Sequence, residues 1–137
     1  MSCPFCEIDS AKTRLLETTP KTMVIFSNPR LVPGHLLVIP KRHVEKLSEL
    51  DIEEKNELFA ALTKWQNKIA EKFASGCDIR QNYRPFLPQG RLKIDHLHFH
   101  LLPREFEDEL YKKSMIHERE IFKDLREEEI EKILNIF

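Results

Sequence analysis

Residues 94–103, IDHLHFHLLP, alternate polar and apolar side chains with a period of two. This alternation is typical of a β-strand that buries one face, because successive side chains of a strand point to opposite sides. His96, His98 and His100 would line one face of the strand, while the apolar residues between them would pack against the core. On a helix, residues two apart would diverge instead. The segment therefore predicts a strand that presents three imidazoles together.

Two further strands and one long helix are expected before this segment. TMVIFS at 22–27 and HLLVIPK at 35–41 are apolar and β-branched, and the unbroken run of the second favours a strand covered on both faces. Asp51 can cap a helix with Glu54 in the capping-box position, and Gly76 can end it. Apolar residues spaced by three or four would form the buried face of this helix: Leu58, Leu62, Trp65, Ile69 and Phe73.

The order of these elements favours an α+β fold with a mainly antiparallel sheet. DIRQNYR at 78–84 is a weaker strand candidate. The connections 28–34 and 85–93 are too short for helical crossovers between parallel strands. The tail from about residue 105 is charged, and a final amphipathic helix is indicated by Ile130, Ile133, Leu134 and Phe137.

Composition excludes several classes of function. The formal net charge of −1 argues against broad nucleic-acid binding, which requires a basic surface. No apolar run approaches the roughly 20 residues that span a bilayer, and MSCPFCEIDS at the N-terminus lacks the regions of a signal peptide. We therefore expect a cytoplasmic protein without a membrane partner. In that reducing compartment its three cysteines would be metal ligands or free thiols.

Three interpretations of the histidines compete. They could be a solvent-exposed polar face, a three-histidine metal site, or a nucleophile with its neighbours. Same-face positions of one strand are about 6 to 7 Å apart, which is far for three ligands of one ion. A neutral imidazole attacks phosphorus well at pH 7, and flanking imidazoles can donate hydrogen bonds to the phosphoryl oxygens.

HLHFHLL at 96–102 fits the His-x-His-x-His-x-x pattern with an apolar residue at every x, and it resembles the motif of the histidine triad (HIT) superfamily of nucleotide hydrolases and transferases. LVPGHLLVIPKRHV at 31–44 and CPFC at 3–6 also resemble segments of that family. The resemblance covers roughly residues 3–104. It implies a five-stranded sheet with one long helix on it, as a single HIT domain over 1–137 whose residues 105–137 form a C-terminal helical extension.

The resemblance also implies roles for single residues. His98 matches the nucleophile that forms a nucleotidyl intermediate, and His100 matches a phosphate contact. His35 would face the phosphates from the neighbouring strand, and Asn28 would bind the ribose hydroxyls. The implied activity is hydrolysis at the α-phosphate of dinucleoside polyphosphates or nucleoside phosphoramidates.

Two alternatives to hydrolysis stay open. Phosphate or a sugar phosphate as acceptor would give a phosphorylase or nucleotidyltransferase, although the sugar-phosphate branch tends to carry glutamine where this chain has His100. A non-catalytic nucleotide-binding protein is the second alternative. Mg²⁺ could arrive with the substrate phosphates, since no dedicated carboxylate site is visible in the sequence. A homodimer is implied by the resemblance alone.

The segment before the triad departs from the family pattern. Better-known members carry Gly-Gln-Ser or Gly-Gln-Thr there, whereas this chain has RLKID at 91–95. Lys93 stands where the hydroxyl is expected, and its ammonium could bind a longer polyphosphate or point to solvent. Asn82 and Gln89 are the other candidates for the missing polar contact.

Cys3 and Cys6 form a C-x-x-C pair that could be a redox pair, half of a zinc site, or two free thiols. The resemblance supplies two further ligands, His43 and His96. A Cys₂His₂ site fills all four positions of zinc, so this zinc would be structural. His96 would then be a structural zinc ligand, and His98 and His100 would take part in the reaction.

Overall fold

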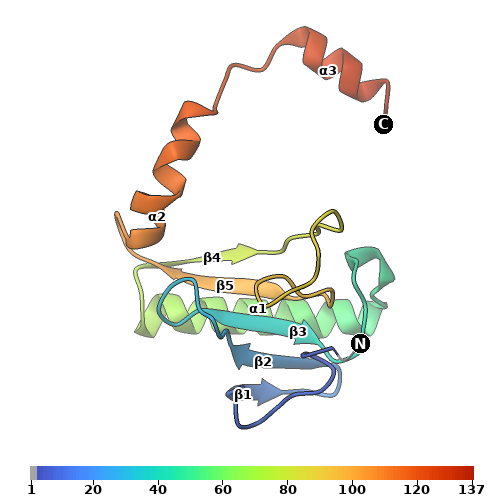
Figure 1. Cartoon of the computed structure of the whole chain (residues 1–137), viewed down its shortest axis with the longest axis vertical. Coiled ribbons are helices and arrows are strands. Elements are labelled where there is room, and N and C mark those ends of the chain that lie inside the picture. The colour runs from blue at the N-terminus through green and yellow to red at the C-terminus, as the bar shows by residue number, and fades with distance from the viewer. Residues whose placement is uncertain (1–2) are drawn as a thin grey trace. The chain divides into compact units, whose positions relative to one another are not determined.

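The computed structural model describes residues 3–137 and divides into two compact units, one up to Phe106 and one over Glu107–Phe137. The first unit is a five-stranded antiparallel sheet in the order β1-β2-β3-β5-β4 with one long helix, as Figure 1 shows. The expected α+β class is therefore confirmed. The elements of the first unit are β1 (Leu15–Thr18), β2 (Thr22–Phe26), β3 (Leu36–Pro40), a short 3₁₀ turn (Leu47–Glu49), α1 (Ile52–Lys72), β4 (Gly76–Arg80) and β5 (Phe99–Arg104).

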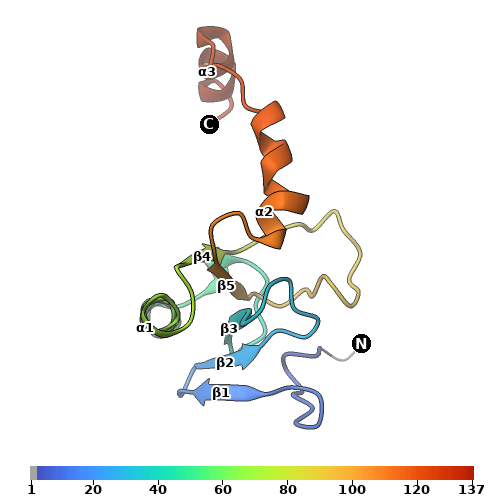
Figure 2. The ribbon, with the colours of Figure 1, turned by 90° about the vertical axis from the view of Figure 1, so that its left-hand side faces the viewer.

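The two faces of the sheet are covered by different parts of the chain. α1 packs on one face, and the N-terminal segment lies on the other, as Figure 2 shows with α1 seen end-on. Neighbouring residues of β3 therefore enter different clusters, Val38 toward α1 and Leu37 toward Phe5. All five residues of β3 are buried, which confirms the strand covered on both faces. The core on the α1 side includes Leu58, Leu62, Ile69, Leu97 and Leu101.

Helix α1 begins as expected and ends earlier than expected. The Asp51 side chain accepts a hydrogen bond from the Glu54 N–H, which confirms the capping box. The helix ends at Lys72, and Gly76 does not end it but begins β4 opposite Arg104. The last turn closes through the Phe73 amide, whose side chain is exposed rather than part of the buried face.

The sheet contains one strand that the sequence pattern missed. β1 is a four-residue edge strand whose side chains are mostly exposed, so it carries no apolar alternation. β4 covers Gly76–Arg80 rather than 78–84, and the chain after Arg80 leaves the sheet as a loop that returns at β5.

The histidine strand also begins later than the alternation predicts. β5 starts at Phe99, so His100 lies in the strand while His96 and His98 lie in the segment before it. Pro40 explains the difference, because proline has no N–H with which to continue the ladder. The Pro40 carbonyl instead accepts a hydrogen bond from the His96 ring, at 2.8 Å. The alternation of faces persists, since Leu97 is buried in the α1 core.

The second unit contains short helices only: α2 (Glu109–Lys113), a 3₁₀ helix (Met115–Glu120) and α3 (Glu127–Leu134). α3 confirms the expected final helix, although its apolar residues Ile133 and Leu134 are exposed. That this unit extends a single HIT domain stays a prediction. Within the described residues, no helix combines the length and the apolar character that crossing a membrane would require.

Candidate active site and metal centre

The expected catalytic histidines line a cleft of about 810 Å³ on the sheet face opposite α1. His100 reaches the cleft from β5 and His98 from the segment before β5. His35 reaches it from the position just before β3. Asn28 and Asn82 line the same cleft. The structure therefore brings five of the predicted catalytic and substrate-binding residues around one cavity, although they come from distant parts of the sequence.

One hydrogen bond fixes which nitrogen of His98 carries the proton. Its Nδ1 lies 2.7 Å from the His96 carbonyl oxygen. A carbonyl oxygen only accepts, so Nδ1 must be the protonated nitrogen. In the neutral ring Nε2 then keeps its lone pair. An unprotonated ring nitrogen is what nucleophilic attack on phosphorus would require.

A second chain of hydrogen bonds orients His100. The Leu31 N–H donates to His35 Nδ1 at 3.0 Å, so the proton of the neutral His35 ring is on Nε2. His35 Nε2 lies 2.9 Å from His100 Nδ1 and donates to it. The remaining proton of His100 therefore sits on its Nε2. That N–H is free to donate to a phosphoryl oxygen.

Burial keeps these rings uncharged. It lowers the pKa of His35 to about 4, with a further contribution from the positive charge of Arg80. It lowers the pKa of His100 to about 3, with smaller contributions from its histidine neighbours and Arg80. Burial also lowers the pKa of His98, against a hydrogen bond to the His96 backbone that raises it. At neutral pH the site is thus a set of neutral imidazoles, and a neutral ring is the nucleophilic form.

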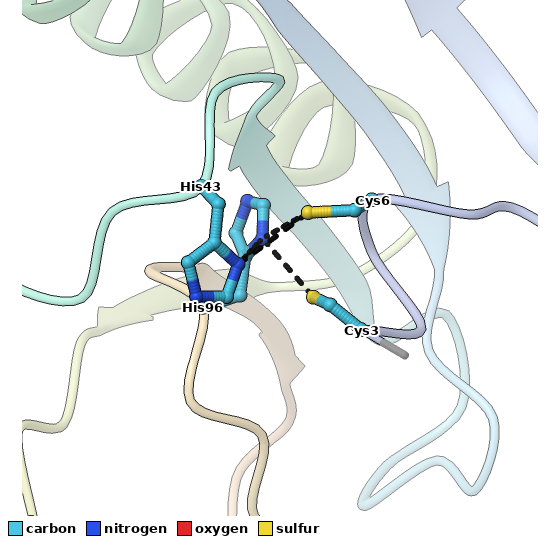
Figure 3. A group of neighbouring side chains, drawn as sticks. All are labelled: Cys3, Cys6, His43 and His96. Carbon is cyan, nitrogen blue, oxygen red and sulfur yellow. Dashed lines mark hydrogen bonds between the residues drawn. The ribbon is translucent and has the colours of Figure 1, made fainter. Parts of the chain in front are cut away.

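Four side chains converge beside this cleft into a group that could hold a metal ion. The donor atoms of Cys3, Cys6, His43 and His96 all lie within 4.8 Å of one another, and Figure 3 shows the four pointing toward a common centre. His96 Nδ1 is 3.3 Å from Cys3 Sγ and 3.5 Å from Cys6 Sγ. His43 Nδ1 is 3.1 Å from His96 Nδ1 and 3.4 Å from Cys6 Sγ.

These four of the six ligand separations, at 3.1–3.5 Å, are close to the edges of a zinc tetrahedron. With zinc–nitrogen bonds of about 2.0 Å and zinc–sulfur bonds of about 2.3 Å, neighbouring ligand atoms lie about 3.3–3.8 Å apart. His96 Nε2 donates to the Pro40 carbonyl, which leaves Nδ1 unprotonated and turned toward the sulfurs. Such a hydrogen bond behind a ligand is the usual way of fixing the ring of a metal-bound histidine. The four residues fit a zinc ion.

Phe5, between the two cysteines, joins the metal group to the histidine cleft. Its ring meets His96 edge-on at 5.8 Å and His98 edge-on at 5.3 Å between ring centroids. Phe5 is buried and lines the large cleft. Phe5 was not among the residues predicted from the sequence, although its position between two expected ligands was the available signal.

The model of the HIT domain matches residues 9–107 of this chain. The chain belongs to the HIT family. Among curated HIT relatives, adenosine 5'-monophosphoramidase hnt1 of Schizosaccharomyces pombe is 32% identical over 114 residues, which are 79% of this chain and 78% of that protein. The asymmetrical bis(5'-nucleosyl)-tetraphosphatase of the same organism is 33% identical over 57% of this chain and 42% of its own length. These names support the expected HIT-family nucleotide hydrolase.

Solved HIT structures agree with the fold. A zinc-bound histidine triad family protein from Mycobacterium smegmatis has a TM-score of 0.65 and 27% identity, over 80% of this chain and 79% of that one. A hypothetical protein from Leishmania major has a TM-score of 0.67 and 26% identity, over 88% and 96% of the two chains. A zinc-bound neighbour is compatible with the Cys₂His₂ group in this HIT chain.

The two remaining predicted residues of this HIT chain lie in the loop between β4 and β5. Lys93 lines a smaller cleft of about 260 Å³ that also includes His98, and its ammonium pairs with the Asp95 carboxylate. Gln89 Oε1 accepts a hydrogen bond from the Asp95 N–H at 3.0 Å, and Gln89 is not among the described residues that line either cleft. Asn82 lines both clefts.

Arg80 is a cleft residue that the sequence analysis did not single out. It is the last residue of β4, it lines the large cleft, and it pairs in register with His100. The available signal was its position two residues before Asn82, on the same side of an extended chain. The expected strand over 78–84 contained it without indicating which face it would take.

Proposed function

We propose that this chain is a nucleotide hydrolase that acts at the α-phosphate of dinucleoside polyphosphates or nucleoside phosphoramidates through a nucleotidyl-His98 intermediate. The single observation that carries the proposal is the protonation pattern of the cleft. His98 offers an unprotonated Nε2, and the neighbouring His100 offers an N–H donor. The hydrolase names of the curated relatives support the same reaction type.

The first chemical step forms a bond between His98 Nε2 and the α-phosphorus. The bond from phosphorus to the leaving oxygen or nitrogen breaks, and its electron pair departs with that group. A leaving nitrogen takes one proton from solvent, and the water that attacks in the second step returns that proton. His100 donates its Nε2 proton as a hydrogen bond to a non-bridging oxygen, whose negative charge grows in the transition state. His35 holds His100 in that orientation through the contact of 2.9 Å between the two rings.

The second step returns the enzyme to its starting state. Water attacks the phosphorus of the intermediate, the P–Nε2 bond breaks, and its electron pair returns to the His98 ring. In sum one water is consumed, with its hydroxyl on the nucleoside monophosphate and its proton on the leaving group. The His96 carbonyl holds the ring through both steps, so Nε2 faces phosphorus throughout.

The other cleft residues would bind the rest of the substrate. Asn28 would hold the ribose hydroxyls, and Asn82 would meet the phosphates. Lys93 and Gln89 remain candidates for the polar contact that Ser or Thr makes in better-known members. The Lys93 ammonium would then contact both the substrate and the Asp95 carboxylate with which it pairs. Mg²⁺ would enter bound to the substrate, because the one group of three or more metal-ligating side chains found among residues 3–137 is the Cys₂His₂ group.

We also propose that Cys3, Cys6, His43 and His96 hold a structural zinc ion. With four protein ligands such an ion has no open position for substrate or water. It would tie the N-terminal segment to the segment that carries His98. A cytoplasmic location would keep both cysteines reduced for this role.

Incubation with diadenosine tetraphosphate and adenosine 5'-monophosphoramidate, each with and without inorganic phosphate, tests the proposed reaction. We expect adenosine monophosphate as a product from both, at rates independent of phosphate. The variant His98→Asn should lose turnover by about three orders of magnitude or more, and circular dichroism checks that it folds. Adenosine diphosphate formed only with phosphate would instead identify a phosphorylase. Tight nucleotide binding without turnover would identify a non-catalytic binding protein.

Three further expectations remain proposals with direct measurements. The chain would be a homodimer, which sedimentation equilibrium would detect as twice the chain mass. It would bind no nucleic acid, which a filter-binding assay with duplex DNA and RNA checks. The core of its single HIT domain would lie at about 3–104, with 105–137 as an extension, so a chain shortened to 1–106 should keep the fold of the first unit, as measured by circular dichroism.

A further inference from the structure

We propose that Arg80 binds the phosphates beyond the attacked one and makes the cleft selective for nucleoside polyphosphates over nucleoside phosphoramidates. This inference rests on the proposed function and specifies its substrate class. The juxtaposition that carries it is between Arg80 and His100, which lie on the same face of the sheet, and Arg80 has no carboxylate partner among residues 3–137.

The register of β4 and β5 places Arg80 on the cleft face. Arg80 and His100 are directly opposite in this antiparallel pair, so their side chains leave the sheet on the same side. Both line the large cleft together with His98. A phosphate next to the one that His98 attacks would therefore lie within reach of the Arg80 side chain.

The carboxylate on the same face of β4 as Arg80 is already engaged. Asp78 lies two residues earlier on β4, and its Oδ2 accepts from Arg104 Nη1 at 2.6 Å. Among residues 3–137, Arg80 makes no ion pair of its own. Its positive charge acts on the cleft, because it contributes to lowering the pKa of both His35 and His100.

The neutral histidines explain why this charge is needed. His35 and His100 supply hydrogen bonds to the cleft, but they bring no positive charge at neutral pH. A phosphoramidate carries its charge on the one phosphate that these rings hold. A dinucleoside tetraphosphate carries further charges, which a guanidinium binds with two parallel hydrogen bonds.

Other basic residues of the cleft are less suited to this role. Lys12, Arg30 and Arg91 also line it, but all three are exposed, whereas Arg80 is half-buried beside His100. Lys93 lines the smaller cleft instead and is paired with Asp95. An exposed arginine contributes less to a phosphate contact, since water and salt screen it.

The test measures the turnover of two substrates by the variant Arg80→Gln. The control is Arg126→Gln, which removes one positive charge from the exposed residue before α3. We expect kcat/KM for diadenosine tetraphosphate to fall by about 10- to 100-fold in Arg80→Gln. For adenosine 5'-monophosphoramidate it should change by less than about 3-fold. Arg126→Gln should change neither. Arg80→Lys should recover part of the loss, because it keeps the charge but not the paired hydrogen bonds. Equal losses on both substrates would overturn the proposal.

A binding measurement separates this proposal from the proposed reaction. Calorimetry with His98→Asn as the background measures the ratio of the dissociation constants of adenosine monophosphate and adenosine triphosphate. Adding Arg80→Gln should bring this ratio at least about 10-fold closer to one. If the parent turned over neither substrate, the reaction would be wrong, while a ratio that depends on Arg80 would still support the phosphate contact. A ratio that does not change on removal of Arg80 would overturn it.

Discussion

His98 Nδ1 donates a hydrogen bond to the carbonyl oxygen of His96, and His96 turns its own ring nitrogen toward Cys3 and Cys6. His96 therefore orients the His98 ring through its backbone and contributes to the Cys₂His₂ group through its side chain. Phe5 reinforces the connection, because its ring contacts both imidazoles. The Cys₂His₂ group and the cleft are connected through His96 and Phe5, so a change in the first is expected to affect the position of His98.

Removal of one sulfur ligand tests the metal group. Cys3→Ser should lower bound zinc from about one ion per chain to near zero. It should also lower the melting temperature by about 5 °C or more, because the ion would tie the N-terminal segment to the sheet. Elemental analysis and differential scanning calorimetry measure the two effects.

Cys77→Ser is the matched control for this experiment. Cys77 lies in β4, outside the Cys₂His₂ group, and burial raises the pKa of its thiol to about 11, so it is a poor zinc ligand. Its substitution should leave zinc content unchanged. Equal zinc content in Cys3→Ser and in the parent chain would show that the four residues do not hold the ion.

The contact between His35 and His100 predicts non-additive kinetics. His35→Asn and His100→Asn should each lower kcat by about 100-fold, the usual cost of one misplaced oxyanion donor. The double variant should be only slightly slower than either single one, because His35 acts by orienting His100. Single-turnover kinetics on the same substrate provide the cycle. Losses that multiply would mean that the two residues act separately.

The low pKa values of these two rings predict how stability depends on pH. A histidine of the unfolded chain titrates near 6.5, whereas folding lowers the pKa of His35 to about 4 and of His100 to about 3. Below pH 6.5 the unfolded chain therefore binds protons that the folded chain does not. The free energy of unfolding should fall as the pH is lowered from about 6.5 to about 4, by up to about 1.4 kcal/mol per pH unit for each ring that stays neutral.

Urea unfolding between pH 4 and 7 measures this dependence. The informative quantity is the difference in slope between the parent chain and His35→Gln at equal zinc content. We expect a shallower slope in the variant, because it lacks one buried neutral imidazole. Identical slopes would mean that His35 is not held neutral by burial.

Gly34 forms part of the turn just before His35, which lines the cleft. Its φ is +79°, and a Cβ at this position would come within 2.7 Å of Phe73 Cε1 and 3.1 Å of Pro103 Cγ. Gly34→Ala should therefore lower the free energy of unfolding by about 1–3 kcal/mol. Gly90→Ala is the control, because nothing lies within 4 Å of its added Cβ, and it should change stability by less than about 0.5 kcal/mol. Denaturant midpoints that agree for the two variants would contradict the close packing at Gly34.

Local sequence patterns determined much of the secondary structure of this protein. The alternation around His96, His98 and His100, the apolar runs of β2 and β3, and the Asp51–Glu54 box each follow from side chains close in sequence, so periodicity and capping chemistry predict them. The HIT motif carried the expected metal ligands and catalytic residues with it. The structure places Cys3, Cys6, His43 and His96 together and gathers His35, His98 and His100 at one cleft.

Only the tertiary structure decided the rest. β5 begins at Phe99 because Pro40, more than fifty residues earlier, cannot continue the ladder. The proton positions of His98 and His100 depend on carbonyl, amide and ring partners that reach them only in the folded chain. Arg80 lines the cleft, and Asp78 on the same face of β4 is engaged by Arg104, 26 residues away in sequence. Each of these features depends on which distant group is the hydrogen-bond partner, and a single sequence with local periodicity does not specify that partner.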